Sequence, residues 1–307
     1  MPLIRHLAPR RGAALAAALA GAALAATSTI ATPTASGDAI PLADIYLVRP
    51  DGTHLHRITN AADEEDLTSD PAWSADGKKL AFVTGEEPAY ISSIAADGSR
   101  RIRLGRGKLQ GFRPDWSPNG RRLLFVAIQG GIFIARGDGS HPRPLRAGKG
   151  SYDKPRWSPN GKRILFMHQG RNAVWHLYVM DANGRNARPL THSRSSDADP
   201  AWSRDGRRIA FARQLRGRWS LFVMIMNADG THVTRLRTGP GSATQPTWSP
   251  DGRRLAYVVQ RGDSTSIWVQ SFGSQRRKRL TSGPMIAYEP AWQPRGAEIA
   301  FVAKRRS

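Results

Sequence analysis

The 307-residue chain contains no cysteine and comparatively few acidic side chains. The absence of cysteine excludes disulfides, thiolate metal sites and thiol nucleophiles. The 24 Asp and Glu residues stand against 46 Lys and Arg residues, which gives a formal net charge of +22 at pH 7. A net charge of this size affects which partners the protein binds and how soluble it is, but it does not indicate the fold. Helical periodicity is missing after residue 40, so the sequence favours a β protein that is stabilised by core burial.

The N-terminal segment differs from the rest of the chain. Arg5, Arg10 and Arg11 precede the run "GAALAAALAGAALAA", which is typical of a secretory signal peptide over residues 1–26. The run is short and alanine-rich for a transmembrane helix, and an uncleaved membrane anchor is the alternative. Residues 27–43 are predicted to be a flexible linker. Residues 1–36 hold three arginines and no acidic residue, so the remaining chain still carries +19. We expect an exported bacterial protein, periplasmic or extracellular.

A motif of the form "TWSPDGRRLAYV" occurs six times after residue 70. Its tryptophans are Trp73, Trp116, Trp157, Trp202, Trp248 and Trp292, in steps of 43, 41, 45, 46 and 44 residues. A period of about 40–45 residues is typical of a four-stranded propeller blade. Asp-Gly and Asn-Gly pairs inside the motif predict tight turns between two strands. The motif therefore predicts the first two strands of each blade.

A second motif follows each copy: an alternating apolar run, a turn with glycine, and a basic strand. It also opens the chain after the linker, as "DIYLVRPDGTHLHRIT", while the chain ends on the first motif, "PAWQPRGAEIAFVAK". The two half-blades are therefore expected to pair, with the strand from Ile45 against the strand around Phe301. The prediction is a single all-β domain over residues 44–307, a six-bladed propeller of four-stranded blades.

The repeats "P-x-W-S-P-D-G-x-x-[IL]-[AL]-[FY]" resemble those of the TolB-like, WD40-like propeller family. They cover essentially the whole chain after the linker. The resemblance implies a six-bladed propeller and, for TolB itself, a periplasmic component of the Tol-Pal system. TolB carries an α/β domain ahead of its propeller, for which this sequence leaves no room. Membership of the Tol-Pal system does not follow from the repeats.

Two sets of repeated residues have structural interpretations. The six tryptophans are expected to fill the gaps between neighbouring blades. Basic pairs follow each turn of the first motif, and ring symmetry places them around one rim, together with cations of the second motif's turns. They are Lys78–Lys79, Arg121–Arg122, Lys162–Arg163, Arg207–Arg208 and Arg253–Arg254. This rim is interpreted as solvated charge, or as a docking surface for an anionic envelope polymer or lipid surface.

The residues ahead of each motif proline are expected to surround the mouth of the central channel. They are Asp70, Arg113, Lys154, Asp199, Gln245 and Glu289, and His168, Arg213 and Gln260 are placed near them on the face opposite the rim. These nine residues are the predicted partner-binding positions, for a peptide or a small ligand. His54, His141 and His232 occupy equivalent turns in different blades and cannot share one ion. No metal site and no cofactor is expected, and a cation in the channel is left open.

No catalytic motif stands out. No G-x-S-x-G occurs, and "GDSTS" at Gly262 lacks the final glycine. Asp70, Asp199 and Glu289 offer a carboxylate pair across the channel as a hydrolase alternative. The sequence favours a non-catalytic, monomeric binding scaffold of the cell envelope with a protein or peptide partner, and nucleic acid is not expected. The alternative is an envelope hydrolase, lyase or small-ligand binder at the channel mouth.

Overall fold

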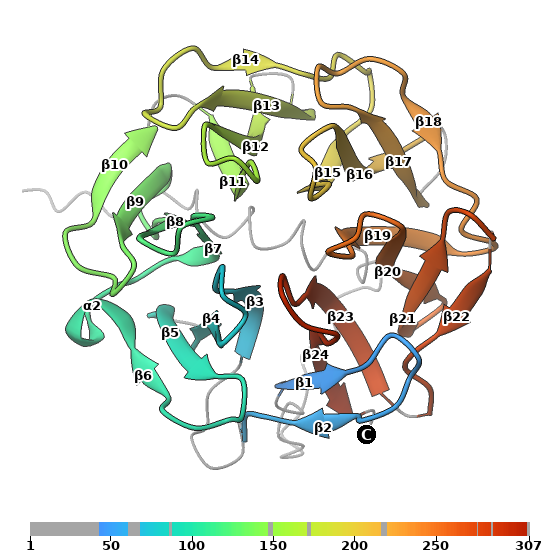
Figure 1. The fold of residues 1–307 in the computed structure, drawn as a ribbon. Helices are drawn as coiled ribbons and strands as arrows, with labels where there is room; N and C mark the ends of the chain where they lie inside the picture. The colour runs from blue at the N-terminus through green and yellow to red at the C-terminus, as the bar shows by residue number, and fades with distance from the viewer. Residues whose placement is uncertain are drawn as a thin grey trace, which may run out of the picture. The chain divides into compact units, whose positions relative to one another are not determined.

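The computed structural model describes residues 43–60, 68–85, 88–146, 150–170, 173–215, 220–274, 276–283 and 285–305. In these ranges the chain forms six antiparallel sheets of four strands, set around a central axis (Figure 1). The six-bladed propeller predicted from the repeats is thereby confirmed. The signal peptide predicted over residues 1–26 and the linker predicted over residues 27–43 lie outside the described residues, apart from Ala43.

Each blade has an inner, a second, a third and an outer strand, counted from the axis. The inner strands are β3 (Thr68–Trp73), β7 (Phe112–Trp116), β11 (Ser151–Trp157), β15 (Asp197–Trp202), β19 (Ser242–Trp248) and β23 (Met285–Trp292). The second strands are β4 (Lys79–Thr84), β8 (Arg122–Val126), β12 (Arg163–Gln169), β16 (Arg208–Gln214), β20 (Arg254–Arg261) and β24 (Ile299–Arg305). The third strands are β5 (Tyr90–Ala95), β9 (Ile132–Arg136), β13 (Trp175–Asp181), β17 (Leu221–Asn227), β21 (Ser264–Ser271) and β1 (Asp44–Val48). The outer strands are β6 (Ile102–Arg103), β10 (Arg143–Arg146), β14 (Arg188–Pro189), β18 (Thr234–Arg235), β22 (Arg277–Arg279) and β2 (His56–Arg57).

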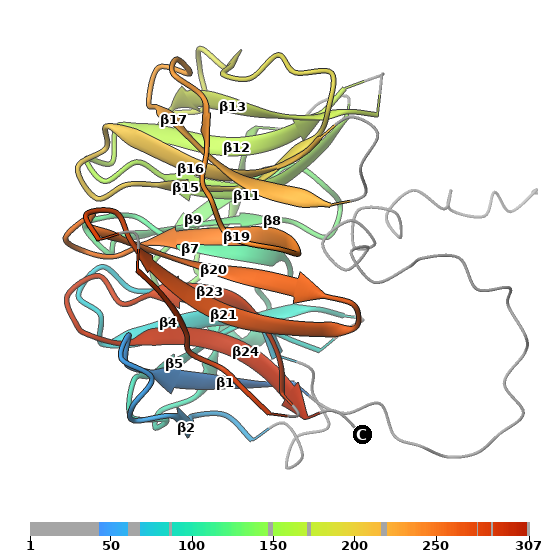
Figure 2. The same ribbon diagram turned by 90° about the vertical axis from the view of Figure 1, so that its right-hand side faces the viewer.

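Seen from the side, the strands of the blades run between the two faces of the ring (Figure 2). The one helical element in the described ranges is α2 (Leu104–Gly107), a single turn in which Gly105 and Arg106 have positive φ. Within the part of the chain that the structure describes, no helix has the length and apolarity needed to cross a membrane.

The sixth blade joins the two ends of the chain, in the order β2-β1-β24-β23. Tyr46 of β1 is the register partner of Phe301 in β24, and Ile45 is the partner of Val302. Ile45 and Val302 are both fully buried. The predicted closure is confirmed, and it leaves no unpaired strand edge at the point where the ring begins and ends.

The core lies between the blades. Each second strand carries one aromatic residue, at most 2 % exposed: Phe82, Phe125, Phe166, Phe211, Tyr257 and Phe301. The repeat tryptophans end the inner strands, and all are buried except half-buried Trp202. Trp73 packs with Ala300 and Val302 of the preceding blade, and its indole Nε1 donates to the carbonyl of Ala291 at 3.0 Å. The large aromatic area of these positions thus contributes to the contacts between neighbouring blades.

Candidate functional site

The inner strands share a bulge that turns one residue of each strand toward the axis. In β3, Asp70 and Pro71 stand opposite a single residue of β4, since Ser69 pairs with Val83 and Ala72 pairs with Ala81. The other five inner strands show the same register shift. Proline suits a bulge because it has no N–H to lose from the ladder.

The six residues before the bulge prolines are here called the inner ring. All have positive φ, between 46° and 57°: Asp70, Arg113, Lys154, Asp199, Gln245 and Glu289. This conformation costs free energy for a residue with a Cβ. It recurs in every blade, so contacts around the ring must offset the cost.

Side chains of the inner ring accept hydrogen bonds from the backbone N–H of the next blade. The N–H of Asp70 donates to Glu289 Oε2 at 2.6 Å, and the N–H of Arg113 donates to Asp70 Oδ2 at 3.3 Å. The N–H of Gln245 donates to Asp199 Oδ2 at 3.1 Å, and that of Glu289 donates to Gln245 Oε1 at 2.8 Å. These bonds satisfy N–H groups that the bulges free from the strand ladders.

The two cations of the inner ring act as donors. Arg113 forms ion pairs with Asp70, with Asp153 at 3.2 Å and with Glu289 at 3.1 Å. Lys154 forms an ion pair with Asp199 in the next blade. The side chains in these pairs are only 7–15 % exposed. The inner ring is therefore a nearly buried charge network that ties the blades together.

The carboxyl groups of the inner ring differ in pKa. Burial raises the pKa of Asp70 and Asp199, but the charges of Arg113 and Lys154 outweigh burial and hold both pKa values below the ordinary range. Burial and, next, the negative charge of Asp70 raise the pKa of Glu289 to about 7. Because burial and the charge of Asp70 outweigh the opposing charges of Arg113 and Lys154 at Glu289, this carboxyl group retains its proton more readily than Asp70 and Asp199 do.

A cavity of about 270 Å³ lies on the axis and is here called the funnel. Five of the six inner-ring residues, all but Arg113, line one end of it. Its wall continues along the inner strands past the tryptophans to the turns that join inner and second strands, where Pro118, Pro159, Pro250 and Pro294 line it. The funnel therefore leads to the face that carries these turns.

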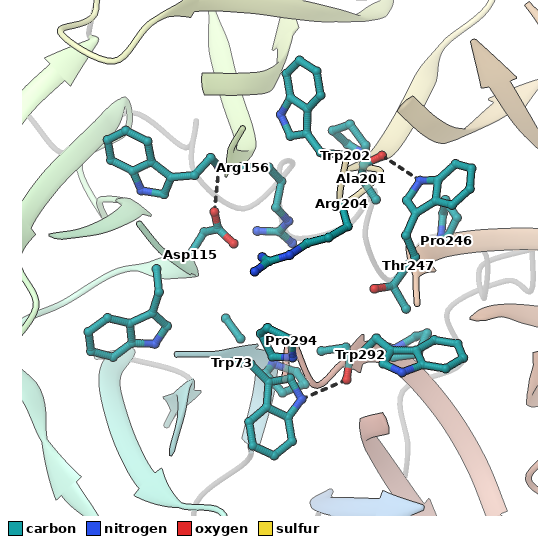
Figure 3. A pocket seen from close by; sticks show the side chains of 18 of the residues that line it. Trp73, Asp115, Arg156, Ala201, Trp202, Arg204, Pro246, Thr247, Trp292 and Pro294 are labelled. Atoms are coloured by element: carbon teal, nitrogen blue, oxygen red, sulfur yellow. Dashed lines mark hydrogen bonds between the residues drawn. The ribbon is translucent and has the colours of Figure 1, made fainter. Parts of the chain in front are cut away.

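The wall of the funnel is not symmetric (Figure 3). Asp115, Arg156 and Arg204 line one side, and the guanidinium groups of Arg156 and Arg204 extend toward the axis. Asp115 Oδ2 accepts the backbone N–H of Trp157 at 2.7 Å. Burial raises the pKa of Asp115 to about 6, although the charge of Arg156 opposes the shift.

The face that the funnel opens onto is here called the basic face. It also carries the turns between third and outer strands, since the N–H of Ala228 donates to the carbonyl of Arg207 at 2.8 Å. The first cation of each repeated pair is exposed there: Lys78, Arg121, Lys162, Arg207 and Arg253.

Three of the second cations lie over the repeat tryptophan of the next blade. The distances to the ring centroid are 4.6 Å for Lys79 Nζ over Trp116, 4.5 Å for Arg208 Cζ over Trp248 and 5.0 Å for Arg254 Cζ over Trp292. Such contacts are cation–π interactions. In the predicted basic rim, all five first cations are therefore exposed, and three of the five second cations contact a tryptophan of the next blade.

The structure brings together six of the nine predicted binding residues, those of the inner ring. The other three lie in second strands and do not line the funnel. His168 belongs to β12 and contacts Tyr152, with ring centroids 4.7 Å apart and the ring planes tilted by 49°. Arg213 binds Asp197 through Nε at 2.6 Å and Nη2 at 2.9 Å, and Gln260 donates to the carbonyl of Gly262 at 3.2 Å.

Asp115, Arg156 and Arg204 were not among the predicted site residues. A signal for two of them was present, because the position between proline and tryptophan varies in charge and polarity between the copies while its neighbours repeat. It holds Ala72, Asp115, Arg156, Ala201, Thr247 and Ala291. As for metals, no group of three or more His, Asp or Glu side chains in the described ranges is arranged to hold an ion.

The fold is a six-bladed propeller with a cavity on its central axis. A family model described as the TolB beta propeller domain matches residues 89–240 and 178–307. The chain belongs to this family.

Similarity to individual proteins is more limited. The Tol-Pal system protein TolB of Alcanivorax borkumensis is 31% identical over 80 residues, which are 25% of this chain and 18% of that protein. The chain thus matches less than a fifth of the length of this curated relative.

Among solved structures, a putative TolB from Agrobacterium tumefaciens has a TM-score of 0.72 at 20% identity and covers 88% of this chain and 100% of its own. An oligogalacturonate lyase in complex with manganese has a TM-score of 0.55 at 12% identity, over 86% of this chain and 91% of its own. At these identities the likeness concerns the fold.

Proposed function

We propose that the protein is an exported, non-catalytic binding scaffold of the cell envelope, and that a segment of a protein or peptide partner enters the funnel. The observation that carries this proposal is the funnel itself, a cavity of about 270 Å³ on the axis with an asymmetric wall. Concave sites with a few directed polar groups are the usual place for a ligand. The name of the curated relative, a Tol-Pal system protein, supports an envelope role.

The inner ring is less suitable for a first test than the funnel wall. Asp199 is the ion-pair partner of Lys154, and Arg213 is the partner of Asp197. Replacing Asp199 or Arg213 with alanine leaves a nearly buried charge without its partner and destabilises the fold. Thr247 lies on the funnel wall, and its hydroxyl faces the cavity (Figure 3).

The test is affinity capture from the producer's own envelope extract, with the full chain as bait at low and at high salt. Thr247→Trp blocks the funnel, and Thr234→Trp adds the same side chain on the exposed outer strand β18. We expect the wild type and Thr234→Trp to retain the same partner at high salt, and Thr247→Trp to lose it. Equal capture by all three proteins would refute a partner site in the funnel.

A hydrolase or lyase is the second candidate. The observation in its favour is the pair formed by Glu289, whose pKa is raised to about 7, and Asp70, whose pKa is lowered, both of which line the funnel. Carboxyl groups with divergent pKa values serve as acid and base in many enzymes. The fold shared with an oligogalacturonate lyase suggests the first substrate to assay. Turnover of oligogalacturonate that Glu289→Gln abolishes would favour this candidate over a scaffold.

A further inference from the structure

The funnel wall has a charged side and an apolar side. Asp115, Arg156 and Arg204 come from blades that are neighbours around the ring. The opposite side consists of small or apolar residues from the remaining blades: Ala72, Ala75, Pro250, Ala291 and Pro294. A ligand that fills the funnel therefore meets two arginines and one carboxyl group on one side and aliphatic surface on the other, with the paired charges of the inner ring at its end.

The two arginines of the funnel have few partners in the protein. Arg156 Nη1 donates to the carbonyl of Pro155 at 3.2 Å, and the charge of Arg156 acts on the carboxyl of Asp115, with which it forms no ion pair in the described ranges. Arg204 is exposed, and within the described ranges it forms no ion pair. In contrast, Arg113, Lys154 and Arg213 are all paired with carboxylates. Arg156 and Arg204 are thus the cations on the axis that remain able to bind an anionic group.

The surface around the opening of the funnel also favours a negatively charged ligand. The exposed cations of the basic face encircle its opening, one in each of five blades. A ring of like charges around a concave site raises the local concentration of anions and speeds their association. The charge of the basic face and the two arginines therefore act together on a negatively charged ligand.

The chemistry of the wall favours a peptide carboxylate over an acidic sugar. A guanidinium group binds a carboxylate through two parallel hydrogen bonds. A sugar ring would require an exposed aromatic face, but five of the six tryptophans that line the funnel are buried and the sixth, Trp202, is half-buried. The aliphatic side instead matches a small apolar side chain next to the acidic group.

We propose that the funnel binds an acidic peptide segment, with a carboxylate on Arg156 and Arg204 and an adjacent apolar side chain against Ala291 and Pro294. This inference rests on the proposed function, because it assigns the chemical class of the partner segment that enters the funnel. It adds that charge at these two arginines, rather than shape alone, selects the segment.

The test measures binding of a fluorescein-labelled Ala-Leu-Glu-Ala-Leu-Glu peptide to the full chain by fluorescence anisotropy. Its counterpart has glutamine for glutamate and an amidated C-terminus. We expect Arg156→Gln and Arg204→Gln each to weaken binding of the acidic peptide by about tenfold, the usual worth of one charge-assisted contact. Arg253→Gln, on the basic face but outside the funnel, should weaken binding by about twofold through loss of attraction alone. Arg188→Gln, on the outer strand β14, should leave it unchanged.

Thr247→Glu and Thr247→Gln form a second pair that is matched in size. The glutamate adds a negative charge to the wall, so we expect it to weaken binding of the acidic peptide, whereas Thr247→Gln should have the smaller effect. Circular dichroism and thermal unfolding confirm that each variant is folded.

Several results would overturn the inference. Equal losses for Arg156→Gln and Arg253→Gln would mean diffuse attraction to the basic face. Binding of an oligogalacturonate, but not of the peptide, with loss in Arg156→Gln would assign the funnel to an acidic saccharide. No binding of the acidic peptide to the folded wild type would also reject it. If Thr247→Trp loses the captured partner while Arg156→Gln and Arg204→Gln retain it, the proposed function stands and this inference fails.

Discussion

At the scale of single residues, the repeated basic pairs show how one motif serves two purposes. Arg207 is exposed in its turn, whereas Arg208 is half-buried and lies over Trp248 and Phe272. Arg208 Nη2 also donates to the carbonyl of Gly252 in the next blade at 3.1 Å. Two adjacent arginines therefore differ in role because the strand turns only the second one toward the neighbouring blade.

We expect Arg208→Ala to lower the free energy of unfolding by about 1–2 kcal/mol, since it removes a cation–π contact and a hydrogen bond between blades. Arg207→Ala should stay within about 0.5 kcal/mol of the wild type, as is usual for exposed positions. Urea denaturation followed by tryptophan fluorescence measures both. Equal destabilisation by the two variants would contradict the division of the basic pairs.

The inner ring makes stability depend on pH through Glu289. A carboxyl whose pKa is raised by folding binds its proton more tightly in the folded state than in the unfolded chain. The stabilisation that Glu289 contributes is complete below pH 4.5, the ordinary pKa of a glutamate, and it is lost as the pH rises through about 7. The lowered pKa values of Asp70 and Asp199 act in the opposite direction and at lower pH, where stability is lost as the pH falls.

We expect Glu289→Gln to flatten the fall in stability between about pH 5 and pH 8, by up to about 1.4 kcal/mol per pH unit, the limit for one proton. Urea unfolding at a series of pH values measures the slope. Glu298→Gln, a glutamate outside the inner ring, is the control and should keep the wild-type slope. Parallel curves for the wild type and Glu289→Gln would contradict a retained proton on Glu289.

At the scale of strands, closure of the ring depends on β1, which is far from β24 in the sequence. Ile45 in β1 is fully buried between the first and last blades, whereas Leu55, in the turn that follows β1, is 46% exposed. We expect Ile45→Ala to cost about 2–5 kcal/mol, since it leaves a cavity at the closure. Leu55→Ala should cost less than about 0.5 kcal/mol. Thermal unfolding of both variants tests this, and a mild effect of Ile45→Ala would mean that the closure contributes little.

The strands were predictable because each repeat contains alternating apolar residues and glycine-containing turns. The gathering of the inner ring was also predictable, since its members precede the prolines that mark equivalent bulges. Their mutual pairing was not, because the bulge reverses φ at Asp70 and its equivalents and so redirects the side chains. Strand periodicity contains no information on that reversal. The prediction that these residues contact a partner remains a prediction.

At the scale of the whole molecule, the sequence predicted that the binding positions surround the channel mouth on the face opposite the basic rim. The funnel opens instead on the basic face, where the turns between inner and second strands line it. Arg156 and Arg204 occupy variable positions of an otherwise regular motif, and only the closed ring brings them to one axis. A site assembled from several blades is visible in the sequence only as small departures from the repeat.

The position of the partner can be determined directly by photo-crosslinking in the producing cell. A p-benzoylphenylalanine at Thr247 probes the funnel, and the same residue at Gln260 probes the opposite face. We expect a covalent adduct with one protein from position 247 and none from position 260. An adduct from position 260 alone would contradict this expectation, because the partner would then bind at the face on which the funnel does not open.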